Sequence, residues 1–269
     1  MVARRMVDAG TAVAVMGNHE LNAIAWFLPD PESPGEFLRP HFSSRWGSRN
    51  REQHKEFLRE VDRRPELHKE IIDWFLTLPL WLELPEIRAV HACWHSRFMA
   101  YLSPKLLPGG CLSEELMVPA SREPLDESEK DTPEPTVFKA VETLTKGVEI
   151  PLPAGHSFLD KDGHRRTRVR VRWWDAGAAT FRTAAMLTEE EREELPGTPI
   201  PGHARIGYSG TKPVFVGHYW FRGPHERLAP NAACVDYSIG KEGRLCAYRY
   251  DGEPSLQDEK FISLGNDEA

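Results

Sequence analysis

Four side chains in three separate stretches could bind a metal ion or transfer a proton. Asn18 and His19 stand together in a Gly-Asn-His-Glu run, while His91 and His218 each lie just past the end of a short apolar run. Amide oxygens and imidazole nitrogens are ligands for divalent metals, and a histidine can also give a proton to a leaving group. A single histidine in such a place is usually an ordinary core or surface residue, and Asn18 could simply cap a helix. The repetition of the pattern favours one shared site.

The apolar runs before these residues predict buried strands. Residues 11–16, 87–90 and 213–216 are short and mostly apolar; the first and third stop at a Gly, and the turn Pro85-Glu86 precedes the second. Residues 11–16 are apolar on both faces, which is typical of a central strand in a parallel sheet. The carboxyl ends of parallel strands meet at one edge of a sheet, where open α/β folds build their sites. We therefore expect Asn18 and the two later histidines to converge.

The rest of the chain is predicted as helices and strands joined by long loops. Apolar spacing, caps and helix-ending glycines predict helices at 3–9, 21–27, 51–62, 65–77, 135–146 and 188–195. Further strands are expected at 80–84, 232–236 and 244–250. Pro-, Ser- or Gly-rich stretches predict surface excursions at 29–50, 104–135 and 196–212. The pattern predicts a single α/β (α+β) domain over residues 1–252, followed by a polar, frayed tail at 253–269.

Length and composition limit the class of protein. The chain has 269 residues, of which 40% are hydrophobic and 28% charged, so it can bury a sizeable core beneath a polar surface. The sequence contains no apolar run of membrane-spanning length and no signal-type start, so we expect a cytoplasmic protein with no membrane partner. The net charge of -7 argues against a nucleic-acid duplex as partner. Four scattered cysteines lack zinc-knot spacing, so we expect reduced, mostly buried thiols.

An arginine-rich segment at 160–174 leaves two structures and two roles open. The Arg-Val alternation over 168–172 fits a strand, whereas the spacing of Arg165, Arg168 and Arg172 equally fits one helix face, which we favour. Guanidinium groups bind phosphate through two parallel hydrogen bonds, so these three arginines could hold an anionic substrate. The other interpretation is a solvated face that pairs with the many glutamates of the chain.

In type and order, the motifs resemble those of the calcineurin-like metallophosphoesterases. The resemblance depends on Gly-Asn-His-Glu at 17–20, on Leu-Pro-Leu at 78–80 leading to Val-His-Ala at 90–92, and on Val-Gly-His at 216–218. Arg-Trp-Trp-Asp at 172–175 and the closing 234–245 segment are similar to parts of the branch that holds phosphoprotein phosphatases and symmetrical diadenosine-tetraphosphate hydrolases. By motif order, the resemblance covers nearly the whole chain.

This resemblance implies a two-sheet β sandwich flanked by helices, with two divalent metal ions (Mn, Fe, Zn or Mg) at the strand ends. His19 would be the proton donor to the leaving oxygen, and Glu20 would act on the site through a neighbouring side chain without contacting the substrate. Asp236 is a candidate hydrogen-bond partner for a ligating histidine. The implied ligands of one metal are Asn18, His91 and His218.

Two features depart from the family pattern. The Gly-His-x-His ending of many members is Gly-His-Tyr-Trp here, a departure that the phosphoprotein-phosphatase branch shares. The opening motifs Asp-x-His and Gly-Asp-x-x-Asp-Arg-Gly, which carry the other metal's ligands, do not precede Gly17. Because residues 3–9 also resemble the end of a helix, we expect that Met1 is not the natural beginning. Roughly 40–80 upstream residues would then belong to the same domain, as in a typical pair of βα units.

The sequence therefore predicts a metal-dependent phosphoesterase. Its partner would be a phosphate-ester substrate, namely a phosphomonoester, a phosphoprotein or a dinucleoside polyphosphate, and two metals would activate the attacking water. The alternative from another class is a catalytically degenerate module of the same fold that binds one metal or a partner protein. A third possibility is an unrelated α/β binding protein whose histidines coincide by chance. No oligomeric state follows from the sequence.

Overall fold

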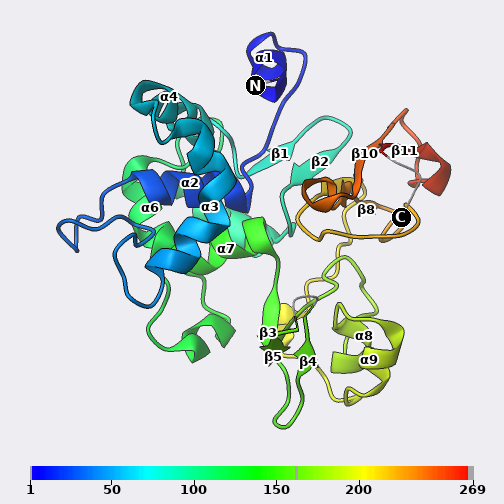
Figure 1. The fold of residues 1–269 in the computed structure, drawn as a ribbon. Helices are drawn as coiled ribbons and strands as arrows, with labels where there is room; N and C mark the ends of the chain where they lie inside the picture. Colours follow the sequence, from blue (N-terminus) through cyan, green and yellow to red (C-terminus); the bar gives the residue numbers. More distant parts are fainter. Residues whose placement is uncertain (1, 161–162, 266–269) are drawn as a thin grey trace. The chain divides into compact units, whose positions relative to one another are not determined.

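The computed structural model describes residues 2–160 and 163–265, which fold into two compact units (Figure 1). The first unit comprises Met1–Leu82, Ser96–Glu123 and Pro135–Thr145, and the second comprises Glu83–His95, Pro124–Glu134 and Lys146–Ala269. Three predictions extend outside the described residues: the natural start at Met1, the arginine-rich segment at 161–162 and the tail at 266–269. A single domain over 1–252 stays a prediction.

The first unit is helical. Its core joins Trp26, Leu58, Val61 and Ile71, which come from three successive helices. Each of these side chains is at most 6% exposed, and burial of one such side chain contributes about 1.5–3 kcal/mol. The helices of this unit are α1 (Val2–Asp8), α2 (Asn18–Phe27), α3 (Gly47–Val61), α4 (Pro65–Leu76), α5 (Ser96–Leu102), α6 (Glu114–Ser121) and α7 (Val137–Lys146), the last of which ends in the second unit. The five helices predicted in this part of the chain are confirmed, with α2 and α3 starting earlier than expected.

Residues 11–16 do not form the predicted strand. A strand exists only through a neighbour that shares its backbone hydrogen bonds, and within the described residues this segment belongs to no sheet. Thr11 and Ala12 instead bond back to the Met6 carbonyl of α1, and the Met16 amide bonds to the Pro79 carbonyl at 2.8 Å. Val13 is 61% exposed, so the segment is not buried on both faces.

Two predicted excursions contain more structure than the sequence indicated. The 104–135 stretch includes α6, which Ser113 caps by accepting a hydrogen bond from the Leu116 amide at 3.1 Å. Leu112 and Met117 are fully buried, so this stretch supplies core rather than only surface. The many proline and acidic residues of this stretch led to the prediction of a surface loop, although Leu112 and Met117 are buried. The 29–50 stretch is a turn-rich loop until α3 begins at Gly47.

The second unit is built on small sheets. Strands β1 (Trp81–Glu83), β2 (Arg88–Val90), β7 (Val214–Val216) and β8 (Ala232–Cys234) form a four-stranded sheet in that order. Of β1, only Glu83 belongs to the second unit. Strand β7 pairs in parallel with β2 and with β8, which places Ala89 opposite Phe215 and Val216 opposite Cys234. The strands predicted at 80–84, 87–90, 213–216 and 232–236 are confirmed.

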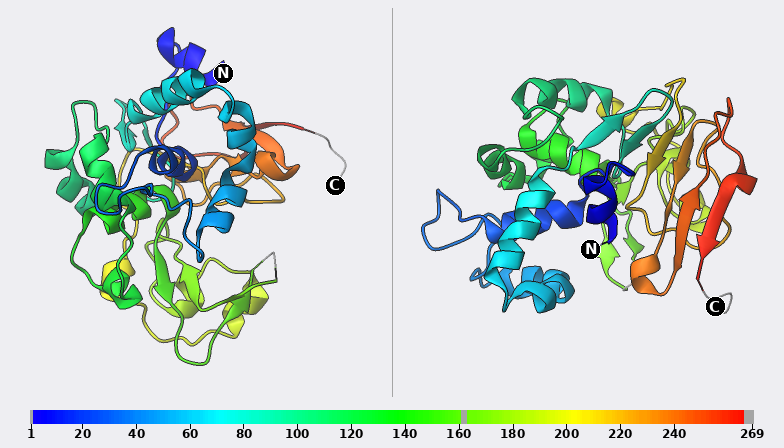
Figure 2. Two further views of the ribbon diagram at one scale, coloured as in Figure 1. Left: turned by 60° about the vertical axis from the view of Figure 1, so that its left-hand side comes forward. Right: turned by 90° about the horizontal axis from the view of Figure 1, so that it is seen from above.

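An antiparallel sheet closes the chain. Strands β9 (Asp236–Tyr237), β10 (Arg244–Tyr248) and β11 (Phe261–Leu264) lie in the order β11-β10-β9. Figure 2 shows β10 in orange beside β11 in red. Strand β11 lies in the stretch that the sequence analysis had interpreted as a frayed tail. Its four residues, Phe-Ile-Ser-Leu, pair with β10, with Phe261 opposite Tyr248, so pairing orders a short apolar run inside an otherwise polar stretch.

The arginine-rich segment is extended, which corrects the predicted helix. Strand β5 (Arg165–Arg166) pairs with β4 (Phe158–Leu159), and β6 (Arg168–Arg170) pairs with β3 (Glu149–Pro151). The two-residue period puts Val169 and Val171 on one face, where they are 1% and 2% exposed in the core of the second unit. A helix would have spread these two valines over two faces. This core also receives residues from α8 (Phe181–Ala184), and α9 (Glu189–Glu193) follows as predicted.

The described residues thus form a mixed α/β structure, which confirms the fold class in its general form. The remaining 3-10 turns are Ser103–Lys105, Glu127–Asp131, Gly202–Ala204, Ile239–Lys241 and Asp258–Lys260. Within 2–160 and 163–265, none of the helices has both the length and the apolar composition to cross a membrane. All four cysteines are free thiols, and Cys93, Cys234 and Cys246 are buried, as expected.

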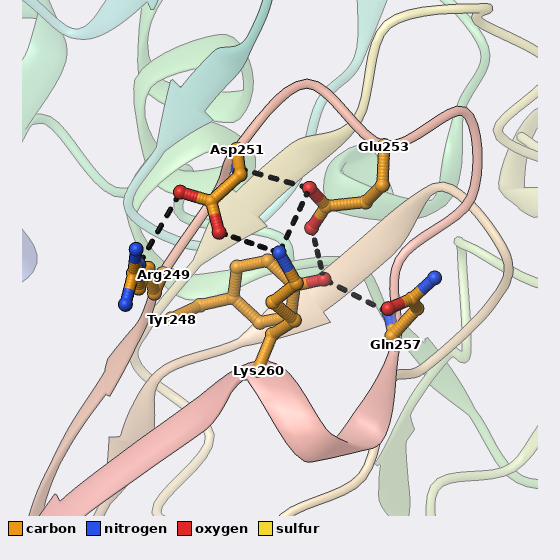
Figure 3. Close-up of polar contacts among 6 residues, drawn as sticks. All are labelled: Tyr248, Arg249, Asp251, Glu253, Gln257 and Lys260. Carbon is orange, nitrogen blue, oxygen red and sulfur yellow. Dashed lines mark hydrogen bonds and ion pairs between the residues drawn. The ribbon is translucent and has the colours of Figure 1, made fainter.

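A polar network holds the ends of β10 and β11 together (Figure 3). The Tyr248 hydroxyl donates to Glu253 Oε1 at 2.6 Å and accepts a hydrogen bond from the Gln257 amide at 2.8 Å. Lys260 Nζ donates to Asp251 Oδ2 at 2.5 Å. Burial, followed by the hydrogen bond to Glu253, raises the pKa of Tyr248 to about 12. The phenol therefore stays protonated and keeps both hydrogen bonds over the neutral pH range.

Replacing Tyr248 with Phe should destabilise this sheet. The change leaves the Gln257 amide and the Glu253 carboxylate without their shared partner, which costs about 1–2 kcal/mol. Urea unfolding followed by circular dichroism measures the loss. Tyr250→Phe is the matched control, since the Tyr250 hydroxyl has no hydrogen bond to another described residue; equal losses in both variants would contradict the role of the network.

The first unit should lose stability in mild acid because of His54. Burial, then the positive charges of Arg39 and His19, lower its pKa from 6.5 to about 4, although a hydrogen bond at Asn22 opposes this. His54 Nε2 is also buried without a hydrogen-bond partner among the described residues. Between about pH 6.5 and 4, His54 is protonated in the unfolded state but mostly neutral in the folded state. The free energy of unfolding therefore falls as the pH drops through this range.

We expect a loss of about 2 kcal/mol between pH 7 and 4.5 that His54→Gln removes. Urea midpoints at the two pH values measure it. His164→Gln, at an exposed histidine of the second unit, should keep the wild-type pH dependence. An unchanged pH dependence in His54→Gln would show that other groups cause the acid sensitivity.

Candidate functional site

Two of the predicted metal ligands lie side by side in the second unit. His91 follows β2 and His218 follows β7, and these neighbouring strands run parallel, so both histidines leave the same edge of the sheet. Their ring centroids are 5.2 Å apart, and the Gly217 amide donates to the His91 carbonyl at 2.9 Å. The sheet register thus brings together two residues 127 positions apart, as the sequence predicted for this pair.

The backbone after β7 turns sharply at the site. His218 and Trp220 have φ angles of 69° and 54°, in the left-handed region that residues with a Cβ rarely adopt. Such conformations cost of order 1–3 kcal/mol each and are concentrated at functional sites. The turn directs His218, 7% exposed, to the edge where His91 lies.

Asp236, the first residue of β9, fixes this turn. Its Oδ2 accepts a hydrogen bond from the Trp220 amide at 3.4 Å, its Oδ1 accepts one from Ser238 at 3.1 Å, and its carbonyl accepts the Phe221 amide at 3.1 Å. The sequence analysis proposed Asp236 as a partner of a ligating histidine. In the structure the Asp236 carboxylate accepts hydrogen bonds from the Trp220 and Ser238 backbone amides, which positions the loop that carries His218; its partnership with a ligating histidine stays a prediction.

Tyr219 anchors the same turn in the core. Its hydroxyl donates to the Ala92 carbonyl at 2.9 Å and accepts a hydrogen bond from Trp173 Nε1 at 2.8 Å. Burial raises the pKa of Tyr219 well above its usual range, so the hydroxyl remains a neutral donor. Since Ala92 follows His91 and Tyr219 follows His218, this one side chain ties the two histidine-bearing loops together. Nothing in the Gly-His-Tyr-Trp run of the sequence indicates this contact of Tyr219.

The Gly-Asn-His-Glu run lies in the first unit, where it begins α2. Asn18 and His19 occupy the first turn of this helix, and His19 is exposed. Glu20 Oε2 accepts a hydrogen bond from the Gly17 amide at 3.0 Å, which caps the helix. The interpretation of Asn18 as the helix cap is therefore wrong, because Gly17 is the N-cap residue and Glu20 accepts the capping hydrogen bond. The same bond gives Glu20 a structural role besides any support of His19.

The three arginines proposed to bind phosphate have separate surroundings. Arg165 donates to Ser157 Oγ at 2.6 Å, at an exposed position on β5. Arg168 is held by Asp131 through hydrogen bonds of 2.7 and 3.0 Å, and this partner raises its pKa. Arg165 and Arg168 therefore fit the alternative interpretation, in which the arginines lie at the surface and pair with polar or acidic side chains. Arg172 instead lines a cavity of about 380 Å³ in the second unit, together with Arg222, which the sequence analysis missed.

The donor set of the second unit suits a divalent metal only in part. Two imidazoles side by side are good ligands for Mn, Fe or Zn. Within the described residues, no group of three or more His, Cys, Asp or Glu side chains is arranged to hold an ion. The pair of His91 and His218 therefore supplies two ligands, and a metal bound there needs further ones, for which Asn18 remains a prediction.

Comparison with known proteins adds no relative to this picture. No protein-family model matches the chain, and no curated protein matches it. The resemblance to metallophosphoesterases therefore depends on the motifs and on the arrangement of the two histidines.

Replacing Tyr219 with Phe should loosen the histidine-bearing loops. It removes the donor to Ala92 and leaves the buried Trp173 Nε1 without an acceptor, which costs about 1–3 kcal/mol. Thermal unfolding measures the loss, and the His91 and His218 imidazole signals in NMR spectra should shift. Tyr101→Phe, at a half-buried tyrosine of the first unit, is the control. Unchanged imidazole signals in Tyr219→Phe would contradict the coupling of the two loops.

Proposed function

We propose that the protein is a metal-dependent phosphoesterase of the calcineurin-like type that hydrolyses a phosphate ester. The observation that supports this proposal is the pairing of His91 with His218 at the carboxyl ends of adjacent parallel strands, with ring centroids 5.2 Å apart. The left-handed backbone of His218 adds weight, because a strained conformation at a histidine is maintained only by surroundings that specify it. The two-sheet sandwich of that family is part of the same proposal.

The proposed roles follow the chemistry of each side chain. His91 and His218, with Asn18, would hold a divalent ion such as Mn, Fe, Zn or Mg. When bound, a pair of such ions lowers the pKa of a water molecule and neutralises charge on the phosphoryl oxygens. His19, which is exposed at the start of α2, would give a proton to the leaving oxygen. The substrate would be a phosphomonoester, a phosphoprotein or a dinucleoside polyphosphate.

A second candidate function is a catalytically degenerate module that binds one metal ion or a partner without chemistry. Two observations favour it: no group of three or more His, Cys, Asp or Glu side chains among the described residues is arranged to hold an ion, and the Asp236 carboxylate accepts hydrogen bonds from backbone amides. Two imidazoles alone would give a weak, single site.

Alanine substitutions should separate metal ligands from the proton donor. His91→Ala and His218→Ala should each lower Mn affinity, since each removes a ligand. His19→Ala should leave Mn affinity unchanged and lower the hydrolysis rate of p-nitrophenyl phosphate by about 10²–10⁴. Calorimetry and absorbance at saturating Mn give the two readouts.

His164→Ala, at an exposed histidine of the β4–β5 hairpin, is the matched control and should change neither quantity. Equal loss of Mn affinity in all three site variants would contradict the assigned roles. The number of metal ions bound by the unaltered chain distinguishes the two candidate functions. Two sites with turnover support the phosphoesterase, whereas one weak site or none, without turnover, supports the degenerate module.

A further inference from the structure

A cavity in the second unit carries a local excess of positive charge. Its volume is about 380 Å³, and four arginines line it: Arg172, Arg192, Arg222 and Arg227. Glu226 is the sole acidic side chain among its lining residues within the described chain. In a protein whose net charge is -7, such a concentration of guanidinium groups marks a site for an anion. We name this space the arginine cavity.

Two of these arginines keep hydrogen-bond donors available. Arg192 Nε is buried and has no partner among the described residues, a state that costs free energy unless a ligand supplies an acceptor. Arg222 forms no hydrogen bond or ion pair with another described side chain or backbone group. Arg172 is oriented by an ion pair with Asp175, whose closest atoms are 3.4 Å apart. Guanidinium groups in this state match the oxygens of a phosphate.

Three aromatic rings complete the lining of the arginine cavity. Trp174 and Tyr237 are 4% and 6% exposed and form its buried part, while Phe221 is half-buried. The ring centroids of Phe221 and Tyr237 are 6.2 Å apart. Aromatic faces of this kind stack with planar rings of a ligand. The cavity therefore offers a surface for a ring next to donors for a phosphate.

The cavity walls are held by hydrogen bonds, so the site exists without a ligand. The Phe221 amide bonds to the Asp236 carbonyl, and the Glu226 amide bonds to the Tyr237 hydroxyl, both at 3.1 Å. The volume lies within the usual range of small-molecule pockets, about 300–1,000 Å³. A neighbouring cavity of about 430 Å³ shares Arg172 and Arg192, but its lining includes three carboxylates, which disfavour an anion there.

We propose that the arginine cavity binds a small phosphate ester of an aromatic or heteroaromatic ring, the class that includes nucleoside monophosphates. The arginines bind the phosphate, and the ring lies against Phe221. This inference goes beyond the proposed hydrolase function and does not need it, because binding in this cavity requires neither a metal ion nor turnover. Its lining also excludes His91, His218, Asn18 and His19.

Calorimetry on the full chain with EDTA present tests the proposal. AMP, adenosine and inorganic phosphate are the probes, and AMP should bind more tightly than either of its parts. Arg222→Ala should weaken AMP binding about tenfold, as expected for the loss of one charge-assisted contact. Phe221→Leu should weaken AMP about five- to tenfold through lost stacking and leave phosphate unchanged.

Arg249→Ala is the matched control, because Arg249 lies on the same unit outside the cavity and pairs with Asp251. It should bind AMP as the unaltered chain does. Absence of saturable AMP binding, or equal effects of Arg222→Ala and Arg249→Ala, would overturn the proposal. Equal affinity for AMP and phosphate, with no effect of Phe221→Leu, would also overturn it, because the ring would then make no contribution.

Discussion

The parallel pairing of β7 with both β2 and β8 is the constraint on which the candidate site depends. Each of these strands is only three residues long, so few hydrogen bonds fix their register. That register brings His91 and His218, which are 127 positions apart, to one edge of the sheet, and Asp236 follows the end of β8 at the same edge. A slip of one residue along β7 would turn each of its side chains to the other face and carry His218 away from His91.

The turn after β7 converts this register into a site. A left-handed residue at His218 and another at Trp220 are unfavourable by themselves, so other interactions must hold them. Asp236 provides this support through backbone amides, and Tyr219 provides it through two buried hydrogen bonds. The polar groups of the loop thereby stabilise one conformation of an imidazole. The same loop continues into Phe221 and Arg222, which line the arginine cavity, so one turn shapes two neighbouring regions.

Sequence patterns predicted the elements whose signal is local. Helices with apolar spacing and caps, such as α4 and α7, agree within about two residues, the usual uncertainty of helix ends. Strand β7 and the pairing of His91 with His218 also follow from apolar runs that stop at a glycine or histidine. Errors arose where non-local pairing decides the structure. Residues 11–16 have strand composition but no sheet, whereas β11 is a short, mostly apolar run inside a polar stretch and is ordered by pairing with β10.

The arginine-rich segment is a second case in which non-local contacts decide the local structure. Its spacing fitted a helix and a strand equally well, and the choice was made by burial of Val169 and Val171 in a core that the sequence does not display. Arg222 lies in no motif, and the Gly-His-Tyr-Trp run did not indicate a structural role for Tyr219, so their contributions became visible only through the cavity and the buried hydrogen bonds. The chemistry of single residues was thus easier to predict than their partners.

The central claim is that His91 and His218 bind one metal ion together. Pulsed electron paramagnetic resonance of the chain with Mn²⁺ tests it directly, because nitrogen nuclei of bound imidazoles modulate the electron spin echo. The account predicts strong nitrogen modulation in the unaltered chain, weaker modulation when either histidine is alanine, and none in the double variant. Modulation that persists undiminished in the double variant, or is absent from the unaltered chain at saturating Mn²⁺, would contradict the account.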